Sequence, residues 1–395
     1  MMEALFLNHS SMLLKSGDEY LLADPWHEKP AFSSWMPSFP MATHPVYIAS
    51  LDKVSILVSH PHQDHFDTDV IKLFNPDVPI ISRFPWAGVE GRPFIKCNPS
   101  VDVGRFKIKS YACGDSDAAY TVESDGSLVL LANDNWNLSP EILAAVKADI
   151  GTKRVLYCSQ VGSASGWPLN YRCYSEDGKK YLLAEKIKKM ADTSLANAKY
   201  LGLEGYVAYA GYALPFVEGK HYHKQFDFAL PEGALDFVPG DVWSAGEIRK
   251  AFIRPASVHK KAEEYYRLYG LVPEVSGEVA PGFVERLREF LKEFRSFGEK
   301  MGIKDKAFYI EIADMDYFKL MRFGIGSSKS TKNLYTTSAV MDKVLRGEML
   351  FEALYTGYLG EWSRYPGDVH NQDITDAITA FSYVWMDKVK RKEAV

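Results

Sequence analysis

Cysteine is scarce in this sequence, with four residues in the whole chain and no Cys-x-x-Cys pair. So few cysteines in 395 residues exclude a disulfide framework. The sequence also lacks any apolar run near the roughly 18 residues of a membrane span. Its N-terminus has no basic region of the kind that opens a signal peptide. We therefore expect a cytoplasmic protein without a membrane partner.

Basic residues are not in excess either, because 46 Lys and Arg stand against 51 Asp and Glu, for a net charge of −5. Nucleic-acid-binding proteins are usually basic, so we expect no nucleic-acid partner. The hydrophobic content of 47% and charged content of 25% are ordinary for a globular protein. These features favour a small-molecule substrate and leave open whether the chain forms a homo-oligomer.

Histidine is scarce as well, yet three of the ten histidines fall within six positions, as His60, His62 and His65. They follow an apolar, β-branched run at 53–59 that predicts a buried strand. A loop leaving a rigid strand end can direct several side chains to one point. Imidazole and carboxylate are ligands of Zn²⁺, Fe²⁺ and Mn²⁺. This stretch therefore predicts a metal centre, with His60 and His62 on one ion, and Asp64 and His65 facing a second.

The rest of the chain divides near residue 245. Alternating or continuous apolar runs predict strands at 4–9, 11–15, 19–24, 79–82, 106–110, 119–122, 127–132 and 155–158. Residues 27–50 are rich in proline and aromatics, which predicts a long loop that covers the substrate. Beyond 245, helices are expected at 258–270, 283–300, 339–362 and 374–390, with strands at 307–312 and 317–321. We therefore expect a metal-binding domain at 1–245 and a C-terminal α+β module at 246–395.

The run Ser59-His-Pro-His-Gln-Asp-His65 resembles the His-x-His-x-Asp-His signature of the metallo-β-lactamase superfamily. This resemblance implies an α/β (α+β) fold, a four-layer αββα sandwich with one or two metals at one edge. It gives Asp134, at the end of the strand 127–132, the position that bridges two metals. The residues alone also allow Asp134 to cap a following helix. His9 and Asp24 lie near strand ends, and we expect them to support the metal-bound histidines from behind.

The superfamily pattern leaves one ligand of the first metal unassigned. No histidine occurs between His65 and His221, and the resemblance places Cys113 where the family has one. Three interpretations stay open: a thiolate ligand, a structural cysteine, or Asp115 as the ligand. For the second metal, His221 or His223 is the expected additional ligand.

Further stretches are similar to the metallo-β-lactamase part of the CMP-N-acetylneuraminic acid hydroxylase family. They are Asp24-Pro-Trp26, Gly162-Ser-Ala-Ser-Gly-Trp-Pro168 and Ala210-Gly-Tyr212. That family carries a Rieske iron–sulfur domain with Cys-x-His and Cys-x-x-His pairs. None of the four cysteines here has a histidine two or three residues on, so we expect no Rieske cluster.

Two enzyme functions follow from these residues. The first is a hydrolase in which two ions, Zn or Fe with Mn as a further option, activate a water molecule. Asp64 or Asp134 would then steer the proton, and the resemblance implies a phosphorylated or nucleotide-linked substrate. The second is an iron-dependent oxygenase that uses the same ligands and an external reductase. A binding protein with a relic site is the non-enzymatic alternative.

Overall fold

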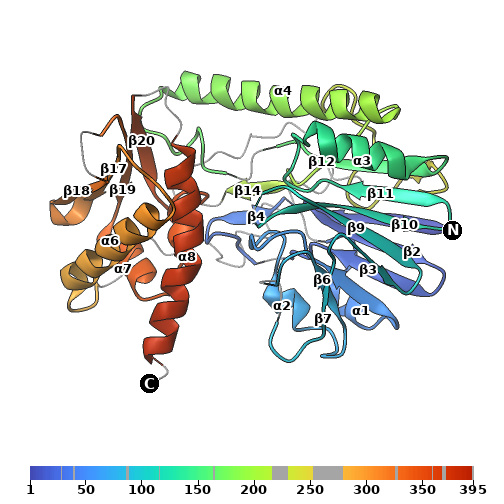
Figure 1. The fold of residues 1–395 in the computed structure, drawn as a ribbon, viewed down its shortest axis with the longest axis horizontal. Coiled ribbons are helices and arrows are strands. Elements are labelled where there is room, and N and C mark those ends of the chain that lie inside the picture. The colour runs from blue at the N-terminus through green and yellow to red at the C-terminus, as the bar shows by residue number, and fades with distance from the viewer. Residues whose placement is uncertain are drawn as a thin grey trace.

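The fold, taken from a computed structural model, has a large sandwich and a C-terminal module beside it (Figure 1). The structure describes residues 1–27, 29–38, 41–85, 89–114, 116–162, 165–215, 230–251, 279–324, 328–357, 359–366 and 371–393. None of the helices in these ranges combines the length and the apolar character needed to cross a bilayer.

Two sheets form the middle layers of the sandwich. The first has the strand order β16 (Glu247–Arg249), β15 (Val242–Ser244), β1 (Met2–Asn8), β2 (Ser11–Ser16), β3 (Glu19–Ala23), β5 (Val54–Leu57), β6 (Ile80–Ser82) and β7 (Phe94–Lys96). The second has the order β13 (Val207–Tyr209), β12 (Arg154–Gln160), β11 (Ser127–Leu131), β10 (Ala118–Ser124), β9 (Phe106–Ala112) and β8 (Ser100–Val103). A small third sheet pairs β4 (Trp35–Pro37) with β14 (Ala213–Pro215).

Both faces of the first sheet are apolar, because successive side chains point to opposite faces and neighbouring residues on its strands are hydrophobic. Leu14 and Leu21 point into the core between the sheets, whereas Leu13 and Leu22 point to the outer face. Helices α1 (Pro45–Ala49) and α2 (Thr68–Ile71) cover that outer face. Helices α3 (Pro140–Ile150) and α4 (Glu176–Leu201) cover the second sheet. This order of layers confirms the predicted αββα sandwich.

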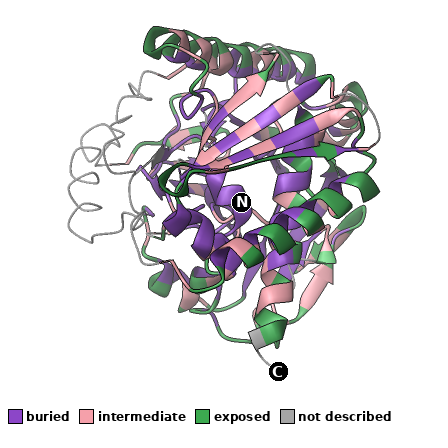
Figure 2. Ribbon diagram, turned by 90° about the vertical axis from the view of Figure 1, so that its left-hand side faces the viewer, coloured by how far each residue is buried: buried purple, intermediate pink, exposed green. Residues whose placement is uncertain are grey.

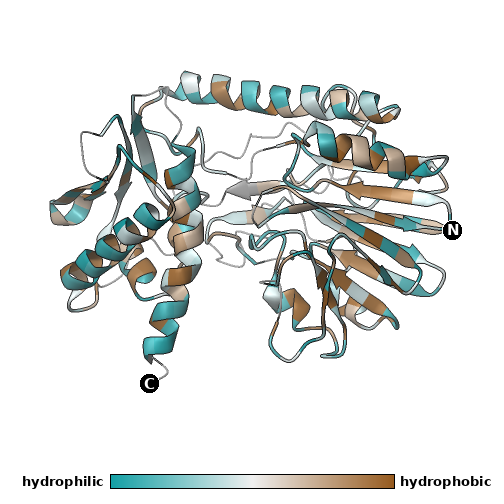
Figure 3. Cartoon of the chain, viewed as in Figure 1, coloured by the Kyte–Doolittle hydropathy of each residue, from teal (hydrophilic) through white to brown (hydrophobic). Residues whose placement is uncertain are grey.

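Burial and hydropathy follow these layers. Figure 2 shows buried residues through the strands and exposed residues on the outer sides of the helices. Figure 3 shows hydrophobic residues on the strands and many hydrophilic residues on α4 and on α6 (Phe283–Lys300). The hydrophobic effect therefore holds each helix to its sheet through one face only.

The C-terminal module has its own four-stranded sheet. Its strand order is β18 (Tyr317–Phe323), β17 (Lys306–Ile312), β19 (Ser330–Thr336) and β20 (Glu361–Tyr365). Its helices are α6, α7 (Ser338–Leu345) and α8 (Gln372–Glu393), with short 3₁₀ turns η2 (Ala313–Met315) and η3 (Phe351–Leu354). The core of this module also contains Trp26, Phe32 and Trp35 from the N-terminal part. The two parts therefore share one hydrophobic core, while the boundary at 245/246 stays a prediction.

Two expectations from the sequence are corrected here. A single helix over 339–362 is wrong, because α7 ends at Leu345 and the chain continues through η3 into β20. Residues 27–50 are not simply a loop, because β4 and α1 form within them and Phe32 and Trp35 are buried at 1% exposure. These aromatics dock the C-terminal module. The helix expected at 258–270 lies outside the described residues.

Candidate metal centre

The ends of several strands bring polar side chains to one edge of the sandwich. His9 lies in the tight turn between β1 and β2, and Asp24 directly follows β3. The histidine loop follows β5, and Asp134 follows β11. His9 and Asp24 have positive φ angles of 27° and 42°, a conformation that costs energy for residues other than glycine and recurs at functional sites.

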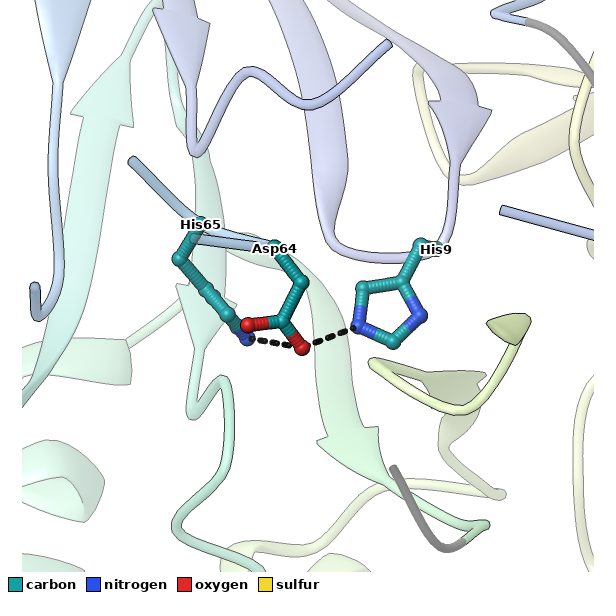
Figure 4. A group of neighbouring side chains, drawn as sticks. All are labelled: His9, Asp64 and His65. Atoms are coloured by element: carbon teal, nitrogen blue, oxygen red, sulfur yellow. Dashed lines mark ion pairs between the residues drawn. The ribbon is translucent and has the colours of Figure 1, made fainter. Parts of the chain in front are cut away.

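Within the described ranges, two groups of side chains offer ligand atoms that lie within 4.8 Å of one another. The first group is His60, His62 and Asp134, and the second is His9, Asp64 and His65. In the second group, Asp64 Oδ2 lies 3.2 Å from His9 Nε2 and 3.9 Å from His65 Nε2 (Figure 4). All three side chains of this group are at most 4% exposed.

Asp134 connects the two groups. Its Oδ1 lies 3.3 Å from His65 Nε2, and its Oδ2 lies 3.7 Å from His60 Nε2. Asp134 thus lies between His60 and His65, and its role as a bridge between two metals stays a prediction. The alternative of a helix cap does not apply, because Ser139 caps the N-terminus of α3.

The hydrogen bonds behind the histidines select which ring nitrogen faces the centre. Ser59 donates its hydroxyl proton to Asp24 Oδ2 at 2.6 Å, so the 3.0 Å contact of Ser59 Oγ with His60 must use a proton on His60 Nδ1. His65 Nδ1 donates to the same Asp24 oxygen at 2.9 Å. The Nε2 atoms of both rings are buried without a hydrogen-bond partner. Both rings therefore present an Nε2 lone pair toward Asp134, as a metal ligand requires.

Burial and neighbouring charges shift the pKa values of these groups. Burial lowers the pKa of His60 well below its usual value, and the adjacent His65 lowers it further. Burial, followed by the charge of Asp134, raises the pKa of Asp117 to about 7. Burial opposes a charge on His62, but the Glu352 carboxylate outweighs it and raises the pKa to about 9. Such opposed shifts within one cluster are typical of functional sites.

The structure does not bring Cys113 into either group. Its thiol donates to the backbone carbonyl of Tyr111 at 3.5 Å and packs against the apolar layer under α3 and α4. Burial raises the thiol pKa to about 11, which disfavours the thiolate. Among the described residues of this loop, Asp117 reaches the histidines, because its Oδ1 lies 3.5 Å from His60 Nδ1. Asp115, His221 and His223 lie outside the described residues.

A pair of variants tests which residue of this loop supports the centre. We expect Asp117→Ala to weaken metal binding about 10- to 100-fold, the usual loss when a group that contacts a ligand is removed. Cys113→Ser should leave affinity and metal content unchanged, because the thiol faces the apolar layer. Competition titration with a chelator measures both. A loss of metal in Cys113→Ser alone would restore the thiolate assignment.

Sequence reasoning gave no weight to two residues near the centre and a lesser role to a third. Asp117 lies in the turn between β9 and β10, and of that stretch only Cys113 and Asp115 were considered as ligands. Glu352 reaches His62 Nε2 at 3.4 Å from a part of the chain almost 300 residues away. His9 was expected only as a support, although it offers a ligand atom within the second group. Its position in a tight turn was the available signal.

Comparison with known proteins supports the resemblance seen in the sequence. No family model matches the chain. It is 25% identical over 252 residues to the CMP-N-acetylneuraminic acid hydroxylase of Mus musculus, covering 56% of this chain and 41% of that protein. For the same enzyme of Xenopus laevis the identity is 24% over 247 residues, covering 55% and 38%. The chain thus spans about two fifths of the length of these relatives.

Solved structures overlap with parts of the fold. A metallo-hydrolase from Ignicoccus hospitalis matches with 15% identity and a TM-score of 0.37 over 53% of this chain and 82% of the other. The diiron β-hydroxylase CmlA from Streptomyces venezuelae matches with 15% identity and a TM-score of 0.36 over 53% and 44%. The metallo-β-lactamase fold protein YhfI from Bacillus subtilis matches with 15% identity and a TM-score of 0.38 over 62% and 100%. These similarities cover part of the chain and concern the fold alone.

Proposed function

We propose that this chain is a metal-dependent hydrolase that carries two transition-metal ions and acts on an anionic small molecule, phosphorylated or nucleotide-linked. One observation carries the proposal. The two oxygens of Asp134 face His60 on one side and His65 on the other. Trp136, two residues beyond Asp134, lines a cavity that also contains three lysines and an arginine, with Glu185 and Asp192 as its acidic residues.

The donor atoms fit a pair of ions. His60 Nε2, His65 Nε2, Asp64 Oδ1 and Asp134 Oδ1 are buried and have no hydrogen-bond partner. Buried polar atoms without partners cost free energy, and a bound cation would satisfy them together. The ligand types suit Zn²⁺ and Fe²⁺, and Mn²⁺ as well. When bound, such ions bring the pKa of a coordinated water to about 7 and polarise a carbonyl or phosphoryl oxygen.

The side chains of this centre divide the remaining work. Asp24 and Ser59 hold the histidine rings in place. Asp64 is 4% exposed, whereas Asp134 is 24% exposed. Asp134 is therefore the better placed of the two carboxylates to accept a proton from the reacting water and pass it outward.

A cavity of about 1040 Å³ provides room for the substrate. Trp136, two residues beyond Asp134, lines it together with Trp167, Lys186, Lys189 and Arg364. Lys186 Nζ lies 5.6 Å from the Trp167 ring centre, and Lys189 Nζ lies 5.9 Å from that of Trp136. Burial lowers the pKa of Lys186 to about 8 while the charge of Asp134 opposes this, so Asp134 acts on this wall. Ammonium groups beside indole rings favour an anionic ligand with a planar ring.

The first test is metal analysis of protein purified without chelator. We expect two ions per chain, colourless zinc-containing protein, and hydrolysis of phosphodiesters or nucleotide-linked substrates. A chelator should stop the reaction, and added zinc should restore it. Protein that binds no metal at these histidines would contradict the proposal.

A second candidate is an iron-dependent hydroxylase with an external reductase. The oxygen and imidazole donors of the described residues support it, because they suit iron as well as zinc. The similarity to CMP-N-acetylneuraminic acid hydroxylases supports it as well. Bound iron with visible absorbance, and a product that gains one oxygen atom, would favour this oxidoreductase over the hydrolase.

Lys186→Ala tests the cavity. We expect the KM for a phosphorylated substrate to rise about 10- to 100-fold, since a charge-assisted contact contributes about 1.5–3 kcal/mol. The kcat should change little, because Lys186 binds the substrate away from the metals. Lys180→Ala, at an exposed site on the same helix, is the matched control. Equal KM values for the wild type, Lys186→Ala and Lys180→Ala would show that the substrate does not bind in this cavity.

A further inference from the structure

The C-terminal module places one buried carboxylate against the metal loop. Glu352 lies in η3 and is 1% exposed. Its Oε1 lies 3.4 Å from His62 Nε2 and accepts a hydrogen bond from Thr379 Oγ1 at 2.9 Å. The backbone N–H of Glu352 donates to Ser382 Oγ at 2.7 Å. Contacts within the C-terminal module therefore hold Glu352 in place, and its carboxylate points toward the histidine loop of the sandwich.

The charge of Glu352 has no basic side chain to balance it within the part of the chain that the structure describes. Its only ion-pair partner there is His62, and its Oε2 is buried without a hydrogen-bond partner. A buried carboxylate without a cation is costly. In this geometry the N–H group of a metal-bound His62 ring would offset the negative charge of the Glu352 carboxylate.

In each of the three histidines of the loop, one ring nitrogen contacts a neighbouring side chain and the other is left for a metal. Which nitrogen makes the contact differs among them. In His60 and His65 the Nδ1 atom is held by Ser59 or Asp24, which leaves Nε2 for the metal. In His62 the Nε2 atom faces Glu352, which leaves Nδ1. A carboxylate behind a metal-bound histidine fixes its tautomer and makes it a better ligand.

We propose that Glu352 is a positioning residue that accepts the Nε2–H of His62, so that His62 binds metal through Nδ1. The inference rests on the proposed metal centre. It adds that the C-terminal module takes part in metal binding, rather than only lining the cavity. A second contact supports the same docking, since Tyr383 Oη of α8 donates to the carbonyl of Pro61 at 3.2 Å.

The test compares zinc affinity in the full chain and in two variants. We expect Glu352→Gln to weaken zinc binding about 10- to 100-fold, the range for removing such a carboxylate. Asp342→Asn is the control, because Asp342 is equally buried in the same module but pairs with Arg286 and Arg346. It should lower the melting temperature and leave zinc affinity unchanged. Histidine ¹H–¹⁵N NMR of the zinc-loaded wild type should show the Nε2–H tautomer for His62.

Three results would overturn the inference. They are an unchanged zinc affinity in Glu352→Gln, an equal loss of affinity in Asp342→Asn, and an Nδ1–H tautomer of His62. The proposed metal centre would stand in each of these cases, because wild-type protein would still bind zinc. A wild-type chain that binds no zinc, iron or manganese would instead remove the metal centre, and with it this role of Glu352.

Discussion

Asp134→Ala is expected to lower kcat for the substrate of the wild-type enzyme by about 10²- to 10⁴-fold, the range for a group that transfers protons. It should also remove at least one of the two metal ions. The reason is that the Asp134 oxygens face both His60 and His65, at 3.7 and 3.3 Å. Elemental analysis and steady-state kinetics on the same preparations measure the two effects.

The fold should survive this change. The side chain of Asp134 is polar and 24% exposed, and the change removes no buried hydrophobic group, so urea unfolding should stay cooperative with a similar midpoint. Asp149→Ala is the matched control, because Asp149 pairs with Lys109 on the same sheet away from the histidines. A fully active, fully loaded Asp134→Ala protein would show that the centre does not use this carboxylate.

Trp35→Ala should destabilise the protein by about 3–5 kcal/mol, the usual cost of emptying a buried aromatic site. Trp35 is 1% exposed, packs in the core shared by both parts, and donates its indole N–H to the carbonyl of Thr356 at 2.9 Å. Truncation leaves a cavity in that core and an unpaired buried carbonyl. The free energy of urea unfolding measures the loss.

The same variant should weaken zinc binding, because the module that carries Glu352 is held in place through Trp35 and its neighbours. Phe318→Ala is the control for aromatic truncation, because Phe318 is 69% exposed in the sheet of that module. Its unfolding free energy should change by less than about 0.5 kcal/mol. A loss of stability below 1 kcal/mol in Trp35→Ala would mean that the shared core does not hold the two parts together.

Local patterns predicted the sandwich and the histidine loop well. The strand before His60 and the strands around Leu13 and Leu22 are short continuous apolar runs, so the hydrophobic pattern alone located them. The close spacing of His60, His62 and His65 located the metal centre, because it too is a short local pattern. All of these signals lie within a few residues of one another.

What the sequence could not reveal depends on distant contacts. The side chain of Glu352 has meaning only beside His62, and no short pattern near it indicates a metal site. The helix expected over 339–362 failed for a related reason. Its apolar spacing is helical, but Gly347 has a φ of 71°, and a side chain at Gly357 would meet the Ala353 carbonyl at 2.3 Å. Packing against Phe32 and Ser34 decides the path there, which propensity does not encode.

The shared core also sets when the site can form during synthesis. The hydrogen bond from Trp35 to Thr356 closes a loop of 321 residues, and that from Tyr383 to Pro61 closes one of 322. At about 5–20 residues per second, a ribosome needs on the order of tens of seconds to make the intervening chain. Contacts of such sequence separation also form slowly once the chain is complete. Trp26, Phe32 and Trp35 must therefore wait for the C-terminal module before they are covered, and during this interval their exposed rings favour aggregation of the nascent chain.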